Sequence, residues 1–161
     1  MQEPNIIPPA PKGHTWHDLM GMALEEAHKA SDLNEIPVGA ILVHLNGKIL
    51  SKTHNMPLGL HDPTAHAEIL ALRQGGKKLK NYRLNDTVLI VTLEPCLMCT
   101  GAIVHSRING LVYGASDKKS GSISSCCEGL ELSFLNHRIW HMGGIRSTEC
   151  AKLLTNFFGH N

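Results

Sequence analysis

The chain has 161 residues, of which 42% are hydrophobic and 18% charged, and its formal net charge at pH 7 is +1. This composition is typical of a globular domain and excludes a disordered chain, while the small net charge neither demands nor excludes an RNA partner. Residues 1–5 lack the basic and apolar segments of a secretory signal, and no apolar run approaches the roughly 18 residues of a membrane span, so we expect a cytoplasmic protein.

The first segment is rich in proline, with four prolines within residues 1–13, and proline removes hydrogen-bond donors and resists helix formation. We therefore expect an N-terminal arm over 1–13 and one folded domain over 14–161. Apolar residues then recur at helical spacing from Trp16 to Ala27. This pattern predicts a helix over about 15–30 that packs one face on a sheet.

Two strands joined by a hairpin are predicted next. The first is the apolar, branched stretch 38–43, and Asn46-Gly47 follows as a typical two-residue turn. The second strand returns over about 48–52. Asp62-Pro63 combines a good N-cap with a residue suited to the first helical position, so we expect a helix that starts there and ends at Gly75-Gly76.

The second half of the chain continues to alternate strands and helices. Residues 87–92 are apolar throughout, as in a central strand covered on both faces, and Glu94-Pro95 is expected to begin the following helix. Further strands are predicted over 111–114 and 139–141. The segment between them, 115–135, reads as a serine- and glycine-rich loop followed by a weakly helical stretch.

A last helix is predicted to start at Ser147 as its N-cap, and its apolar face consists of Cys150, Leu153, Leu154, Phe157 and Phe158. The alternation of strands and helices predicts an α/β fold. We expect a three-layer α/β/α sandwich with a central mixed sheet of about five strands, helices on both faces and parallel later strands.

Three residues with metal-ligand chemistry, His66, Cys96 and Cys99, fall near the starts of two predicted helices. Helix N-termini carry partial positive charge, which favours the thiolate form that binds metal, and two cysteines three positions apart share one helix face. Three protein ligands leave a tetrahedral zinc one open position for water. Glu68, two residues after the histidine, is placed to move the proton of that water. We therefore predict one zinc per chain.

Other interpretations of the C-x-x-C motif remain open on these residues alone. A structural zinc site needs four ligands, and the adjacent pair Cys126-Cys127 could complete one. A redox motif would leave His66 and Glu68 without a role. The odd number of cysteines, five, favours reduced thiols and metal binding over a disulfide framework.

The order H-x-E and P-C-x-x-C resembles the signature of zinc-dependent cytidine and deoxycytidylate deaminases, a superfamily that also contains guanine and adenosine deaminases. Longer blocks are similar to the bacterial tRNA-specific adenosine deaminases: 61–68, 72–76, 81–84, 91–96, 98–108, Gly114-Ala115, Asp117, 136–138 and Phe157-Phe158. The likeness covers roughly residues 15–158, nearly the whole chain.

This resemblance implies a fold of the cytidine deaminase type and hydrolytic deamination of the wobble adenosine of a tRNA anticodon to inosine. It implies that His66, Cys96 and Cys99 hold a zinc that activates water for attack on a flipped-out adenine, with Glu68 as proton shuttle. Asn55 matches the family asparagine that reads the base edge. The residues that match family positions near the anticodon loop are Asp117, Lys119, Asn136, His137 and Arg138. The implied partners are a tRNA anticodon stem-loop and a second copy of the chain, with no membrane and no DNA.

Two rival functions share the metal signature. The same zinc chemistry could act on a free base or nucleoside such as guanine or cytosine, because pocket shape sets the choice of base. A catalytically idle zinc- or RNA-binding module is the other rival, and Glu68 argues against it because such a module has no use for a carboxylate beside an open ligand position. Met56 departs from the family pattern, since it stands where an arginine is common.

Overall fold

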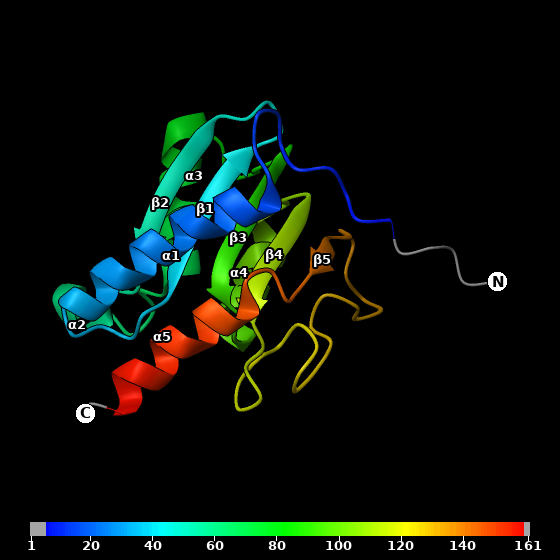
Figure 1. Ribbon diagram of the computed structural model, residues 1–161. Helices are drawn as coiled ribbons and strands as arrows, with labels where there is room; N and C mark the ends of the chain where they lie inside the picture. Colours follow the sequence, from blue (N-terminus) through cyan, green and yellow to red (C-terminus); the bar gives the residue numbers. More distant parts are fainter. Residues whose placement is uncertain (1–5, 160–161) are drawn as a thin grey trace.

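The computed structural model describes residues 6–159, in which five strands form one mixed sheet between layers of helices (Figure 1). The strands are β1 (Gly39–His44), β2 (Ile49–His54), β3 (Thr87–Leu93), β4 (Gly110–Ala115) and β5 (Trp140–Met142), and the helices are α1 (Trp16–Asp32), α2 (Pro57–Leu60), α3 (Ala67–Leu79), α4 (Leu97–Ser106) and α5 (Ser147–Gly159). The sheet order is β2-β1-β3-β4-β5; β1 is antiparallel to β2 and β3, whereas β3, β4 and β5 run parallel. The predicted α/β/α sandwich is confirmed.

The central strand β3 separates two hydrophobic cores. Leu89 and Val91 pack into the core beneath α3 and α4, whereas Val88 and Ile90 pack into the core beneath α1 and α5 (Figure 1). Side chains of a strand alternate between its faces, so a strand covered on both sides must be apolar at every position. This explains the uninterrupted apolar run from which the strand was predicted.

Strand ends determine where a site can form on this sheet. Gly39 pairs with His54, Ala40 with Val91, and Leu93 with Ala115, so the ends of β2, β3 and β4 meet at one edge of the sheet. The helices α3 and α4 also begin at this edge, which we call the carboxyl edge. Segments that follow these strands are therefore brought together although they lie far apart in the sequence.

The residues before α1 contact the β1–β2 hairpin. Residues 6–14 form no helix or strand, but the Lys12 N–H donates to the Leu45 carbonyl at 3.1 Å and the Trp16 indole N–H donates to the Pro8 carbonyl at 2.9 Å. Gly47 occupies the turn of the hairpin with a φ of +99°, a conformation that favours glycine. Residues 1–5 of the predicted arm lie outside the described residues.

The prediction that a helix starts at Asp62-Pro63 is wrong, because α3 begins at Ala67. The Asp62 carboxylate accepts hydrogen bonds from the Thr64 N–H and hydroxyl, both at 2.8 Å, and thus closes a local turn instead of capping a helix. The short helix α2, which was not predicted, precedes this turn. As a result His66, and not Asp62, is the N-cap residue of the helix.

The predicted end of this helix at Gly75-Gly76 is also wrong, because α3 continues to Leu79 and stops at Lys80, which is in the left-handed conformation. A Cβ atom on Gly75 would lie 2.3 Å from Cδ2 of Leu42. Glycine is needed here for close packing of the helix on β1, which local sequence patterns do not distinguish from a helix end.

Later boundaries shift as well. The helix expected from Glu94-Pro95 starts at Leu97, because the Glu94 N–H still pairs with the Ala115 carbonyl across the sheet. The prediction of a weakly helical stretch within 115–135 is wrong, because the segment between β4 and β5 contains turns and irregular structure but no helix. Ser147 is the first residue of α5 and not its cap. Of the predicted apolar face only Cys150 is buried, whereas Phe158 is 57% exposed. None of the helices within residues 6–159 is long and apolar enough to cross a membrane.

Candidate metal centre

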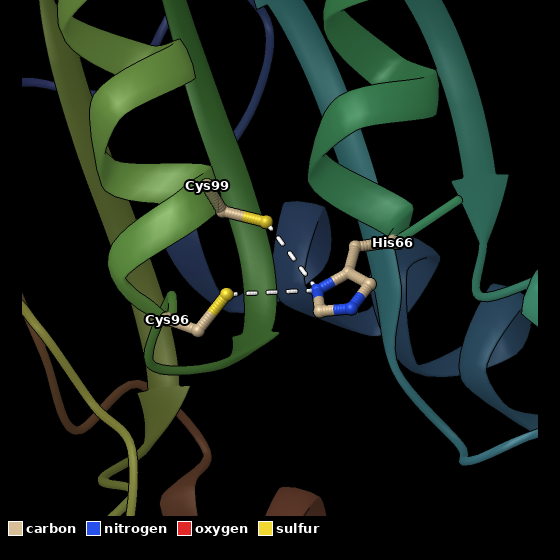
Figure 2. Close-up of side chains that lie close together, drawn as sticks. All are labelled: His66, Cys96 and Cys99. Atoms are coloured by element: carbon tan, nitrogen blue, oxygen red, sulfur yellow. Dashed lines mark hydrogen bonds between the residues drawn. The ribbon is translucent and has the colours of Figure 1, made fainter. Parts of the chain in front are cut away.

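The three predicted metal ligands converge at the carboxyl edge of the sheet. His66 is the N-cap residue of α3, Cys96 is the N-cap residue of α4, and Cys99 lies in the first turn of α4. Figure 2 shows the three side chains pointing toward one another from these two neighbouring helix starts. Nδ1 of His66 lies 3.6 Å from Sγ of Cys96 and 3.5 Å from Sγ of Cys99.

These distances fit one zinc ion. A tetrahedral zinc with Zn–S bonds of about 2.3 Å and a Zn–N bond of about 2.0–2.1 Å holds the sulfur and nitrogen atoms about 3.5–3.6 Å apart. Within residues 6–159, this cluster is the one group of three or more metal-ligating side chains whose donor atoms come together, all within 4.8 Å. Cys126 and Cys127 are exposed and do not join it, so the described residues form a three-ligand site and not the four-ligand structural alternative.

The charges of the thiols point to a cation at the same place. Hydrogen bonds from Cys99 and then from His66 lower the pKa of the Cys96 thiol to about 4. Cys96 and burial raise the pKa of the Cys99 thiol, because a second negative charge beside the first is unfavourable in a buried site. Both sulfurs can therefore carry negative charge only with a cation between them, as in a zinc site.

Glu68 is the second residue of α3 and is almost completely buried, with 4% exposure. Burial raises the pKa of its carboxyl group, and the helix backbone and the charge of His66 oppose this shift only in part. A carboxyl group with a raised pKa can both take and return a proton near neutral pH. Glu68 is not among the three metal-ligating residues, which leaves it available for proton transfer.

Asn55 follows β2 at the same edge and is 7% exposed. Its Oδ1 accepts the backbone N–H of Ala67 at 2.8 Å. The Nδ2 group has no hydrogen-bond partner among residues 6–159. In this fold the amide oxygen already accepts one hydrogen bond from the chain, and the NH2 group is left to donate.

Asp117 and Lys119 follow β4, also at the carboxyl edge. The Asp117 carboxylate accepts the backbone N–H groups of Lys119 at 3.0 Å and Ser120 at 3.2 Å, so this side chain shapes its own turn. The Lys119 side chain is exposed. These two residues follow a strand that ends at the same edge of the sheet as the metal ligands.

Asn136, His137 and Arg138 lie elsewhere. They precede β5, whose first residue, Trp140, pairs with Gly110 at the start of β4, so they occupy the opposite edge of the sheet from the metal ligands. The His137 ring donates to the Ile108 carbonyl at 2.7 Å, which gives this side chain a structural contact. One chain therefore brings Asn55, Asp117 and Lys119 to the metal edge, but not these three residues.

Sequence reasoning missed the role of Glu94, which stands two residues before the ligand Cys96. Its carboxylate accepts four backbone N–H groups from residues 117–125, a segment that we call the Glu94 loop. Burial alone raises the pKa of a carboxyl group, but these bonds, led by that from Ser124, lower the pKa of Glu94 to about 2. The available signal was an acidic residue directly after an apolar central strand.

Known proteins share this arrangement. A model of the cytidine and deoxycytidylate deaminase zinc-binding region matches residues 14–115, which contain the three ligands and Glu68. The tRNA-specific adenosine deaminase of Haemophilus influenzae is 49% identical over 140 residues, 87% of this chain and 81% of that protein. The protein of the same name from Aquifex aeolicus is 44% identical over 141 residues, covering 87% and 91%. A solved structure from a study of A-to-I editing by tRNA:A34 deaminases at the wobble position of transfer RNA has a TM-score of 0.82 and 38% identity, and the match covers 85% of this chain and 99% of that one.

Proposed function

This chain belongs to the tRNA-specific adenosine deaminases of the zinc-dependent cytidine and deoxycytidylate deaminase family, and we propose that it deaminates the wobble adenosine of a tRNA anticodon to inosine. The observation that carries the proposal is the three-ligand cluster with the buried carboxyl group of Glu68 at the start of the same helix as His66. A structural metal site does not need such a carboxyl group, whereas hydrolysis does.

His66, Cys96 and Cys99 would hold one zinc, which supplies Lewis-acid activation of the attacking water. Glu68 takes a proton from this water as the oxygen adds to C6 of adenine, and it delivers a proton to the ring nitrogen N1. It then takes the proton of the hydroxyl group added at C6 and transfers it to the amino group, the C6–N bond breaks, and ammonia leaves as the C6 carbonyl forms. The base becomes hypoxanthine, and the nucleoside inosine. The raised pKa of Glu68 suits a group that must both accept and donate.

Asn55 is proposed to orient the base. Its oxygen already accepts the Ala67 N–H, whereas its NH2 group is left to donate, so we propose that this group binds an acceptor on the substrate. Purine ring nitrogens that do not react, N3 and N7, are such acceptors. Lys119 and Arg138 are proposed to contact phosphate groups, and Asp117, Asn136 and His137 to lie near the anticodon loop.

We propose that the chain acts as a homodimer in the cytoplasm, as one deaminase domain over 14–161 with an N-terminal arm over 1–13. Support for a second copy comes from a groove of about 400 Å³ between α4 and the segment after the Glu94 loop. Its rim carries exposed apolar side chains, among them Leu97 at 70% and Phe134 at 76% exposure. Exposed apolar side chains of this size gather where a partner covers them.

The proposal is tested by offering the purified protein a tRNA transcript, an anticodon stem-loop, adenosine, guanine and cytidine in separate reactions. We expect inosine in the RNA substrates at the wobble position. Conversion of guanine to xanthine with unedited tRNA would instead assign a free-base deaminase. Gel filtration with light scattering tests the dimer independently of the substrate.

A further inference from the structure

Glu94 connects the metal centre to the segment that follows β4. The residue is 2% exposed and lies between the end of β3 and the N-cap ligand Cys96. Its Oε1 atom accepts the backbone N–H of Asp117 at 3.1 Å and the hydroxyl group of Ser125. Its Oε2 atom accepts the backbone N–H groups of Ile123, Ser124 and Ser125 at 2.9–3.1 Å. One side chain thus fixes both ends of the Glu94 loop.

The loop fits closely around this carboxylate. A Cβ atom on Gly121 would lie 2.4 Å from Cδ of Glu94, so only glycine allows the chain to pass there. The Ser122 N–H also donates to the Pro95 carbonyl at 2.8 Å. The Glu94 loop is therefore seated on the two residues that lead directly into the metal ligand, and its position relative to Cys96 is set by these contacts.

We propose that Glu94 is a positioning residue for substrate binding, which holds the Glu94 loop in the conformation that presents Asp117 and Lys119 to the RNA. The inference rests on the proposed function, because it assumes an RNA substrate at this edge. A loop that is already ordered does not have to be ordered when the substrate binds, so pre-organisation lowers the cost of binding. Glu94 then affects the affinity for RNA through the loop and does not take part in the reaction at the base.

Glu94→Gln tests this with little change in shape. An amide has only one oxygen, so the N–H groups bound to the other carboxylate oxygen would face an NH2 group and lose their acceptor. Gly121→Ala disturbs the same contact without changing any charge. We expect both variants to raise the KM for an anticodon stem-loop about tenfold, as for loss of hydrogen bonds to a charged group, with kcat per bound zinc within about twofold of the parent.

Two matched controls separate this effect from general destabilisation. Glu35→Gln makes the same chemical change at a buried carboxylate that accepts the N–H groups of Leu58 and Gly59, and Gly159→Ala adds a methyl group in open space. We expect Glu35→Gln to lower thermal stability while the KM for the stem-loop stays at the parent value. Gly159→Ala should change neither quantity.

Hydrogen–deuterium exchange measures how well the Glu94 loop is ordered in the absence of substrate. Exchange should become faster at residues 117–125 in Glu94→Gln and Gly121→Ala, with zinc content still about one per chain. Unchanged exchange in both variants, or a lowered kcat per zinc with an unchanged KM, would overturn the proposal; the latter would show that Glu94 acts on the metal centre. If the parent protein does not edit RNA, the proposed function fails, while the exchange result still decides whether Glu94 holds the loop.

Discussion

Oδ1 of Asn55 accepts a hydrogen bond from the backbone N–H of Ala67 at 2.8 Å. Ala67 stands between the ligand His66 and the buried Glu68, so this bond ties the end of β2 to the peptide that carries both groups. It also satisfies a helix N-terminal N–H that has no partner within the helix. Asn55 therefore has two separable roles, one in the fold and one proposed toward the substrate.

Asn55→Asp separates these two roles. A carboxylate can still accept the Ala67 N–H, so we expect thermal stability and zinc content near those of the parent. The NH2 donor is replaced by a negatively charged acceptor, so we expect editing of an anticodon stem-loop to fall at least about a hundredfold, the loss typical of a site that holds an unpaired polar group against the substrate. Asn55→Ala should lose both activity and stability. Editing by Asn55→Asp at the parent rate would contradict the proposed base contact.

Cys96→Ala and Cys99→Ala each leave two protein ligands, so we expect zinc and activity to be lost together. Metal analysis of the purified variants measures this directly. Cys126→Ser and Cys127→Ser serve as controls, because both thiols are exposed and outside the cluster, and each should keep about one zinc per chain. If Cys99→Ala kept its zinc and Cys127→Ser lost it, Cys127 and not Cys99 would be the zinc ligand.

Thiol reactivity gives an independent check of the same assignment. Burial raises the pKa of Cys150 to about 11, so this thiol stays protonated at pH 8 and should react slowly, becoming reactive only as the pH approaches that value. In the zinc-loaded protein we expect a disulfide reagent to modify about two thiols per chain quickly, Cys126 and Cys127, because these are exposed. Chelation of the zinc should release Cys96 as a third reactive thiol. Rapid modification of Cys150 in the folded protein would argue against its burial between α5 and the sheet.

The fold was largely predictable because its signals are local. Continuous apolar runs and the turn at Gly47 indicate the strands, and the H-x-E and C-x-x-C spacings indicate the metal ligands. Two of the errors have long-range causes. Gly75 is pressed against Leu42 in a distant strand, and the Glu94 carboxylate, 23–31 residues before its partners, occupies N–H groups that a helix in 115–135 would have needed.

Only those residues of the site that belong to short sequence motifs could be predicted. His66, Cys96, Cys99 and Glu68 were identified from residue type and spacing. The bond from Asn55 to Ala67 was not, because it depends on the ends of β2 and α3 meeting at the carboxyl edge.

RNA contacts were assigned by resemblance, and their positions differ. Lys119 lies at the metal edge, whereas Arg138 lies at the opposite edge and also donates to the Leu132 carbonyl at 3.4 Å. Lys119→Ala should weaken editing of all tRNA substrates alike and reduce the slope of log affinity against log salt by about 0.7, the value for one phosphate of a single strand. Arg138→Ala should do the same if the RNA extends to that edge. Lys152→Ala on α5 is the control, since this exposed lysine lies in the opposite helical layer. An unchanged salt slope in both Lys119→Ala and Arg138→Ala would remove these residues from the RNA contact.

The central claim is that zinc held by His66, Cys96 and Cys99 and the carboxyl group of Glu68 together deaminate the wobble adenosine. It is tested most directly by measuring inosine at that position of a tRNA transcript after exposure to the parent protein and to Glu68→Gln, each with its zinc content determined. Since Glu68 transfers protons and does not bind the metal, the variant should keep about one zinc per chain and lose at least about 10²–10⁴-fold in rate, while the parent forms inosine. Inosine formed at the parent rate by Glu68→Gln, or no inosine with the zinc-loaded parent, would contradict the account.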